Sequence, residues 1–297
     1  MRNSLFLGHL LALFSVLVWG STFSATKVLL EDFDAIEILF IRFFIAYWFL
    51  FALHFRGIKW GGWGLEMLFA GAGLSGACLY FLLENIALNY TSASNASLLV
   101  AISPLFTALL SAFFLKKKIG KYFFIGAILA FVGVGFVVFR GEFSFHLNAF
   151  GDMLCICAGL VWSVYTILMG KIFIACESQN ALSITRKVFF YGLTFTLPLL
   201  LLHFYMGDGD LSRVWGGLQN PNNLLMFAFL GFLASALCYV SWNGALKYLG
   251  LIKASAYIYS VPVIGVIVAV LSLGESLNIF IVIGGFLVMK GLFLSQK

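Results

Sequence analysis

The chain has 297 residues, of which 62% are hydrophobic and 10% charged, and its mean hydropathy is +1.05. Soluble domains contain roughly a quarter charged residues, so this composition excludes an ordinary soluble protein and places the chain in a lipid bilayer. The formal net charge of +6 lies mainly in the connections between apolar segments, where it indicates membrane topology, and we expect no nucleic-acid partner.

Apolar segments follow one another along the whole chain. A helix needs about 20 residues to cross ~30 Å of hydrocarbon, and ten segments approach or exceed that length. They lie at 5–28, 36–55, 65–88, 94–115, 121–139, 151–173, 183–204, 224–247, 253–273 and 277–294. The longest polar stretch, 207–223, is predicted to be one loop. The predicted fold class is an all-α integral membrane protein with ten transmembrane helices.

The second half of the chain repeats the first. A displacement of 158 residues aligns identical residues, without a gap, between Phe69 and Gly133 and their counterparts. A displacement of 143 residues does the same between Gly8 and Trp19. An internal repeat of this kind defines the architecture before any local feature does. We therefore predict two units of five spans each, 1–145 and 146–297.

Loop charge predicts the orientation, because Lys and Arg concentrate on the cytoplasmic side of a membrane. With the N-terminus inside, the basic loop KKKIGK (116–121) is cytoplasmic and the acidic stretch EDFDAIE (31–37) is outside. Both termini are then cytoplasmic. Five spans are an odd number, so the second unit enters the membrane inverted, and the counterpart of KKKIGK is the acidic GESLN (274–278). Inverted repeats predict alternating access to a site near the bilayer midplane.

Four segments of the chain share a pattern with a known family. They are WGSTFSATK (19–27), TSASNASLLVAISPLFTALL (91–110), WNGALKYL (242–249) and KASAYIYSVPVIGVIVAVLSLGE (253–275). Together with Arg42 they resemble the EamA-type transporters of the drug/metabolite transporter superfamily, and the resemblance extends over both repeats. The family usually ends its fourth span with an acidic residue, where this chain has Lys117. Only Glu275 is acidic here, so the resemblance assigns Glu275 no transport role.

The resemblance implies a secondary transporter in the inner membrane of a bacterial cell, because similar members mostly export amino acids and related metabolites. We therefore expect alternating-access transport of a small metabolite, with export favoured. Two alternatives stay open: an importer of a host- or medium-derived metabolite such as a nucleoside-like compound, and an intramembrane enzyme that acts on lipid. The sequence has no catalytic, nucleotide-binding or metal-binding motif, so we expect no enzyme, cofactor or metal. The protein is expected to be a monomer or a homodimer.

Glu84 is an acidic residue well inside the third span. A charge at the centre of a span costs ~2.5–3.5 kcal/mol on insertion scales, so it usually faces a cavity or a partner. We interpret Glu84 either as a proton-coupling carboxylate or as a binder of a substrate ammonium group; pairing near the outer end of the span is the structural alternative. Tyr80 lies one turn earlier on the same face.

Two pairs of repeat mates place polar groups at equivalent depths. The amides of Asn85 and Asn243 need hydrogen-bond partners away from water, either across helices or on a ligand. Trp19 and Trp162 lie deeper than the interfacial belt that tryptophan usually occupies, so they are candidates to line a cavity. The two asparagines are candidates to meet near the interface of the two units.

The predicted cavity wall combines repeat mates with residues that share their helix faces. Its members are Trp19, Tyr80, Glu84, Asn85, Trp162, Tyr165, Tyr239 and Asn243. Arg42 is a further candidate, either as a binder of a substrate carboxylate or as a side chain that extends to headgroups. Pro104 and Pro262 occupy matching positions and are expected to kink spans four and nine, either for packing or as gate hinges. An aromatic site with a few polar groups suits a small amphiphilic metabolite.

Overall fold

A computed structural model describes residues 2–56, 59–139, 149–273 and 279–295, and all regular structure in these ranges is helical. The first half contains α1 (Arg2–Trp19), α2 (Thr22–Leu29), α3 (Ala35–Leu53), α4 (Trp63–Gly73), η1 (Leu74–Leu79), α5 (Tyr80–Tyr90), α6 (Ala93–Val100), α7 (Ser103–Leu115) and α8 (Lys121–Phe139). The second half contains α9 (Ala149–Ala175), α10 (Ala181–Tyr205), α11 (Leu211–Leu218), α12 (Pro221–Ala228), η2 (Phe229–Leu237), α13 (Cys238–Leu249), α14 (Leu251–Ser255), η3 (Ala256–Ser260), α15 (Val261–Leu273) and α16 (Ile279–Ser295).

The described residues include eight helical stretches that are long and apolar enough to cross a membrane. Eight of the ten predicted spans are thus confirmed as membrane-length helices. The fifth and tenth predicted spans coincide with two shorter apolar helices, Lys121–Val137 and Ile279–Ser295. The protein is therefore an all-helical membrane protein. The acidic segment 274–278, which contains Glu275, lies outside the described residues.

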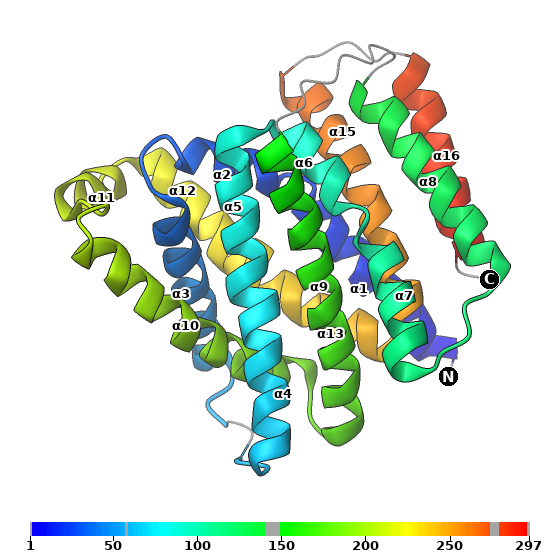
Figure 1. Cartoon of the computed structure of the whole chain (residues 1–297), viewed down its shortest axis with the longest axis horizontal. Coiled ribbons are helices and arrows are strands. Elements are labelled where there is room, and N and C mark those ends of the chain that lie inside the picture. The colour runs from blue at the N-terminus through cyan, green and yellow to red at the C-terminus, as the bar shows by residue number, and fades with distance from the viewer. Residues whose placement is uncertain (1, 57–58, 140–148, 274–278, 296–297) are drawn as a thin grey trace.

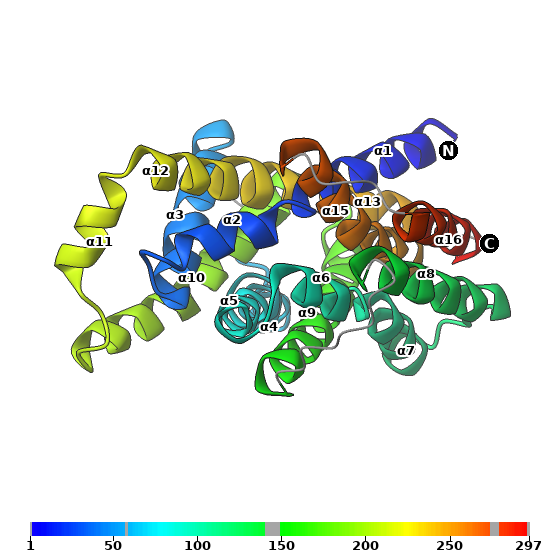
Figure 2. The ribbon, with the colours of Figure 1, turned by 90° about the horizontal axis from the view of Figure 1, so that it is seen from above.

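The two halves interlock, and their contacts follow the repeat (Figures 1 and 2). The first helix of one half packs against the third span of the other: α1 contacts α13, and α9 contacts α5. Likewise α3 packs on η2, while α10 packs on η1. The helices that end the two halves, α8 and α16, run side by side at one edge of the molecule. Each half therefore completes the packing of the other.

Glycine allows α8 and α16 to approach each other closely. A Cβ atom at Gly133 would lie 2.6 Å from the carbonyl oxygen of Gly284, and one at Gly284 would lie 2.5 Å from the carbonyl oxygen of Gly133. Real Cβ atoms do not come that near to backbone, so only glycine fits at this crossing.

Both third spans contain a π-helical segment at the same place in the repeat. A displacement of 158 residues lays η1, residues 74–79, on 232–237, which is the second part of η2. A π turn is wider than an α turn, and such turns are frequent at functional sites. Here each one lies at the centre of a membrane-length helix that contacts the other half.

The fourth span of each half is interrupted just before its proline. In the first half the helix breaks at Ala101 and Ile102, and in the second half η3, a 3₁₀ turn, separates α14 from α15. Pro104 and Pro262 are each the second residue of the helix that follows. Proline fits there because the first residues of a helix have no internal partner for their N–H groups. Both prolines therefore stand in the first turn of a helix, and their role as gate hinges stays a prediction.

The prediction of a single loop over 207–223 is wrong, because the segment contains α11 and the start of α12. Local capping explains both helices. The Asp210 side chain accepts a hydrogen bond from the Ser212 N–H at 2.8 Å, and Asn220 accepts one from the Asn222 N–H at 3.0 Å. Pro221 then occupies the first position of α12. These are the residue types that favour helix starts.

Candidate functional site

A small cavity lies where the two halves meet. Its volume is about 40 Å³, whereas pockets that hold drug-sized ligands have about 300–1,000 Å³. The residues that line it are Trp19, Thr22, Phe23, Arg42, Tyr80, Phe81, Glu84, Ser97, Val100, Ala101, Ser103, Trp162, Ile258 and Val261. The interruptions of spans one, four and nine thus contribute to the wall. In this conformation the cavity has room for only about one or two water molecules.

Arg42 and Glu84 bring opposite charges to this cavity. Their exposed fractions are 1% and 2%. The Arg42 Nε donates to the Ser235 hydroxyl at 3.1 Å, and the guanidinium carbon lies 4.1 Å from the centroid of the Phe81 ring. Its Nη1 has no hydrogen-bond partner within the described part of the chain. Charges buried at this depth are costly and typically belong to a substrate or ion pathway.

The predicted tryptophan mates meet in the cavity wall. The ring centroids of Trp19 and Trp162 are 5.5 Å apart in an edge-to-face arrangement, and Tyr80 lies 5.0 Å from Trp162. The indole N–H of Trp19 donates to the Ala234 carbonyl at 2.9 Å. The indole N–H of Trp162 is buried without a partner among the described residues. Two equivalent side chains therefore differ in hydrogen bonding.

The π-helical segments exchange hydrogen bonds across the interface of the halves. Gly76 in η1 and Ala234 in η2 are repeat mates, separated by 158 residues. The Tyr239 hydroxyl of the second half donates to the Gly76 carbonyl at 2.5 Å, while Trp19 of the first half donates to the Ala234 carbonyl. Each half therefore supplies an aromatic donor to the same backbone position of the other.

Four of the predicted wall residues pack outside the cavity. Tyr165 donates to the Asn243 Oδ1 at 2.7 Å, and Asn243 Nδ2 donates to the Thr185 hydroxyl at 2.8 Å. Asn85 Nδ2 donates to the Ala35 carbonyl at 3.0 Å. None of these residues, nor Tyr239, lines the cavity. This geometry favours the helix-bridging alternative for both asparagines. Pro104 and Pro262 are also buried outside the lining, but Ser103 and Val261 beside them form part of it.

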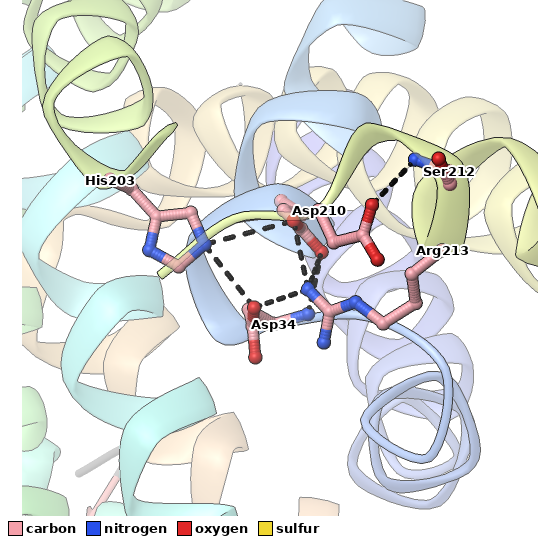
Figure 3. A network of polar contacts seen from close by, with 6 residues as sticks. Asp34, His203, Asp210, Ser212 and Arg213 are labelled. Carbon is pink, nitrogen blue, oxygen red and sulfur yellow. Dashed lines mark hydrogen bonds and ion pairs between the residues drawn. The ribbon is translucent and has the colours of Figure 1, made fainter. Parts of the chain in front are cut away.

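A second polar cluster joins the halves at one end of the molecule (Figure 3). The Arg213 guanidinium bonds the Asp34 carboxylate and lies 3.0 Å from both Glu37 oxygens. The His203 Nε2 lies 3.2 Å from Asp34. Glu37 also accepts the Asp34 N–H at 2.8 Å, which caps α3. We call Asp34, Glu37, His203 and Arg213 the end cluster.

The end cluster is an ion-pair network. Its hydrogen bond to Arg213 lowers the pKa of the Asp34 carboxyl, and the same bond raises the pKa of Arg213. Asp34, Glu37 and His203 are metal-ligand types, and their ligand atoms lie within 4.8 Å of one another. However, the cationic Arg213 already bonds both carboxylates. The sequence offered no signal for this cluster, because Arg213 falls in the stretch predicted as a loop.

At the opposite end of α10, basic residues bind the first half directly. Lys187 Nζ lies 2.6 Å from Glu66, and the Tyr191 hydroxyl donates to the same carboxylate at 2.6 Å. Arg186 donates to the His54 carbonyl. These contacts tie α10 to α3 and α4, so α10 is held at both ends by side chains of the first half.

Comparison with known proteins identifies the chain. A family comparison matches residues 6–139 and 149–296, one match in each half, to the EamA-like transporter family. The chain belongs to the EamA-like transporter family. This is a family of transporters and not of enzymes, and the double match supports duplicated halves in this EamA-like protein.

Relatives of this EamA-like chain occur in archaea and bacteria. An uncharacterized transporter of Archaeoglobus fulgidus is 30% identical over 97% of this chain and 96% of its own. A probable terminal-alkyne amino-acid exporter of Streptantibioticus cattleyicolor is 26% identical over 95% of this chain and 91% of its own. A probable amino-acid metabolite efflux pump of Salmonella typhimurium is 26% identical over 96% and 93%.

A solved crystal structure has the same fold as this EamA-like chain. The two superpose with a TM-score of 0.76 at 17% sequence identity, over 99% of this chain and 96% of the other.

Proposed function

We propose that the protein is a secondary transporter that exports a small metabolite, an amino acid or a related compound, by alternating access. One observation carries the proposal: two oppositely charged side chains, Arg42 and Glu84, are buried in one cavity at the junction of the halves. Their charges together suit a zwitterion, and the surrounding aromatic rings suit its apolar part. Two relatives whose names include amino-acid export support this substrate class.

The transport cycle follows from an inverted topology. We propose ten spans in two inverted five-helix units, with both termini in the cytoplasm of a cell whose inner membrane holds the protein. The cavity has about 40 Å³, too little for an amino acid, so the enclosing helices must separate on one side at a time. Exchange of conformation between the two units would open the site to each side in turn.

Energy for the cycle is proposed to come from a gradient, because the sequence has no nucleotide-binding motif. Glu84 is the candidate for proton coupling, since it is the buried carboxylate of the cavity wall. Import of a nucleoside-like compound is the second candidate function. The charge pair favours the amino acid, because a neutral nucleoside has no ionic groups to pair with Arg42 and Glu84.

Counterflow in proteoliposomes tests the function. Vesicles that contain the purified protein and a high internal concentration of one unlabelled compound are given a trace of the same labelled compound. We expect transient accumulation for at least one amino acid. Accumulation of nucleosides alone would instead establish the importer alternative, and the absence of flux for every metabolite in the panel would refute transport of these classes.

A further inference from the structure

We propose that Arg42 and Trp162 form a carboxylate-binding element, and that the protein accepts only substrates with a free carboxylate next to an ammonium group. This inference rests on the proposed function and names the part of the substrate that the cavity recognises. It follows from two buried donors that lack acceptors and line the same cavity.

The first donor is the guanidinium of Arg42. It has five N–H groups and no acceptor, but its only hydrogen bond among the described residues is from Nε to Ser235. Phe81 covers the cation through its ring and offers no hydrogen-bond acceptor. None of the guanidinium nitrogens comes within 4 Å of a carboxylate oxygen in the described chain. A buried guanidinium with unsatisfied N–H groups is suited to bind an anionic oxygen that enters the cavity.

The second donor is the indole N–H of Trp162, which is free because one position of the repeat carries a hydroxyl group in the second half and none in the first. Its repeat mate Trp19 bonds the Ala234 carbonyl of η2. The equivalent acceptor for Trp162 would be the Gly76 carbonyl of η1, but the Tyr239 hydroxyl occupies that oxygen. The residue equivalent to Tyr239 in the first half is Phe81, which has no hydroxyl group to compete with Trp19. The Trp162 donor thus remains available to a ligand.

A carboxylate fits these two donors, and Glu84 defines the rest of the ligand. Indole and guanidinium groups only donate hydrogen bonds, whereas a carboxylate only accepts them and has two oxygens. Glu84 lines the same cavity and would repel an anion that has no positive charge. A ligand with adjacent carboxylate and ammonium groups matches both charges, so the arrangement selects an α-amino acid zwitterion over a plain amine or a plain acid.

Calorimetric titration of the purified full-length protein in detergent tests the proposal. Two probe sets each hold the side chain constant: L-leucine, L-leucinamide and 3-methylbutylamine, and L-phenylalanine, L-phenylalaninamide and phenethylamine. We expect at least one of the two amino acids to bind and its amide and amine to bind about tenfold or more weakly, since loss of a charge-assisted hydrogen bond has that effect. If an amide binds as tightly as its amino acid, the carboxylate element is refuted while the transport proposal stands.

Matched tryptophan variants locate the element. Trp162→Phe removes the indole N–H from the cavity wall together with part of the ring. Trp242→Phe is the control, because Trp242 is also buried, also has an unpartnered indole N–H and does not line the cavity. We expect about tenfold weaker amino-acid binding for Trp162→Phe and unchanged binding for the control. Equal effects would overturn the inference. If no member of either probe set binds the wild type, both the amino-acid function and the carboxylate-binding element are refuted.

Discussion

The region of the first half around the cavity differs in charge from the equivalent region of the second half. Glu84 and Trp242 are repeat mates at a displacement of 158 residues. Alignment of the helix caps Asp34 and Asn180, which also superposes Phe43 on Phe189, places Val188 opposite Arg42. Both charges of the cavity therefore have uncharged counterparts.

The second half instead uses the equivalent depth for a neutral network. Tyr165, Asn243 and Thr185 bond one another and are completely buried. The first half thus presents both ionic groups to the cavity, while the second half joins these three polar side chains in a neutral network and contributes the unpartnered indole N–H of Trp162. The comparison teaches that the repeated helices supply a common frame, whereas a few side chains that differ between the halves place both charges of the cavity in the first half.

The largest expected effect is a difference in cysteine labelling between the two sides of the membrane, which tests the orientation of the two halves. A single cysteine placed in 207–213 should react with a membrane-impermeant thiol reagent on whole cells, and one placed in 116–121 should not, because the proposed inversion puts these segments on opposite sides. Cys157, an exposed native cysteine, is replaced first to remove background. Labelling in the reverse pattern would refute the orientation.

Removal of the Glu84 charge from the cavity should almost abolish transport. We expect Glu84→Gln to lower flux by more than about tenfold, because a neutral amide loses the charge-assisted bond to a substrate ammonium. Counterflow and pH-driven uptake are measured together. Loss of both indicates substrate binding, and loss of the pH-driven flux alone indicates proton coupling. Glu66→Gln, a buried carboxylate outside the cavity lining, is the control and should keep counterflow.

The two asparagine mates should differ in their contribution to stability. Asn243→Ala removes two hydrogen bonds and leaves the buried Tyr165 hydroxyl without its acceptor, whereas Thr185 keeps its bond to the Ala181 carbonyl. We therefore expect a loss of about 2–4 kcal/mol in the free energy of unfolding. Asn85→Ala removes one bond from an amide whose Oδ1 is already unpartnered among the described residues, so the loss should be about 1 kcal/mol. Unfolding in detergent, followed by circular dichroism, measures both. A larger loss at Asn85 would contradict the assigned networks.

The smallest expected effect is at the end cluster. The pKa of Asp34 is lowered in the folded protein, so its contribution is present above the ordinary carboxyl pKa of about 3.9 and disappears as pH falls through the lower folded value. Asp34 is 39% exposed, so solvent screening limits the contribution to about 1 kcal/mol or less. Below pH of about 4 the wild type should lose stability faster than Asp34→Asn. Parallel pH curves for the two proteins would disprove the contribution.

Hydropathy and the repeat predict the helices of this chain well, because a span of about 20 apolar residues has few alternatives in a bilayer. The cavity is predicted only in part. Its wall contains five of the predicted residues: Trp19, Arg42, Tyr80, Glu84 and Trp162. Tyr165 and Asn243, in contrast, bond each other behind that wall. Sequence spacing gives the residues that share a face, but not the rotation of that face toward a neighbouring helix. Nor does it reveal ion pairs such as Glu66–Lys187, whose members are far apart in the chain.

The π turns of η1 and η2 set that rotation. A π turn contains about one residue more than an α turn, and one residue corresponds to about 100° around a helix axis. Everything from Tyr80 to Tyr90 therefore faces a direction that an uninterrupted helix of the same sequence would not reach. A one-residue deletion within Leu74–Leu79 would remove the extra residue, so the segment could continue as an α-helix while Glu84 kept its present face. Because both copies contain the wider turn at the same place, the helix that follows it in each third span, α5 or α13, carries the same rotation relative to the helix before it.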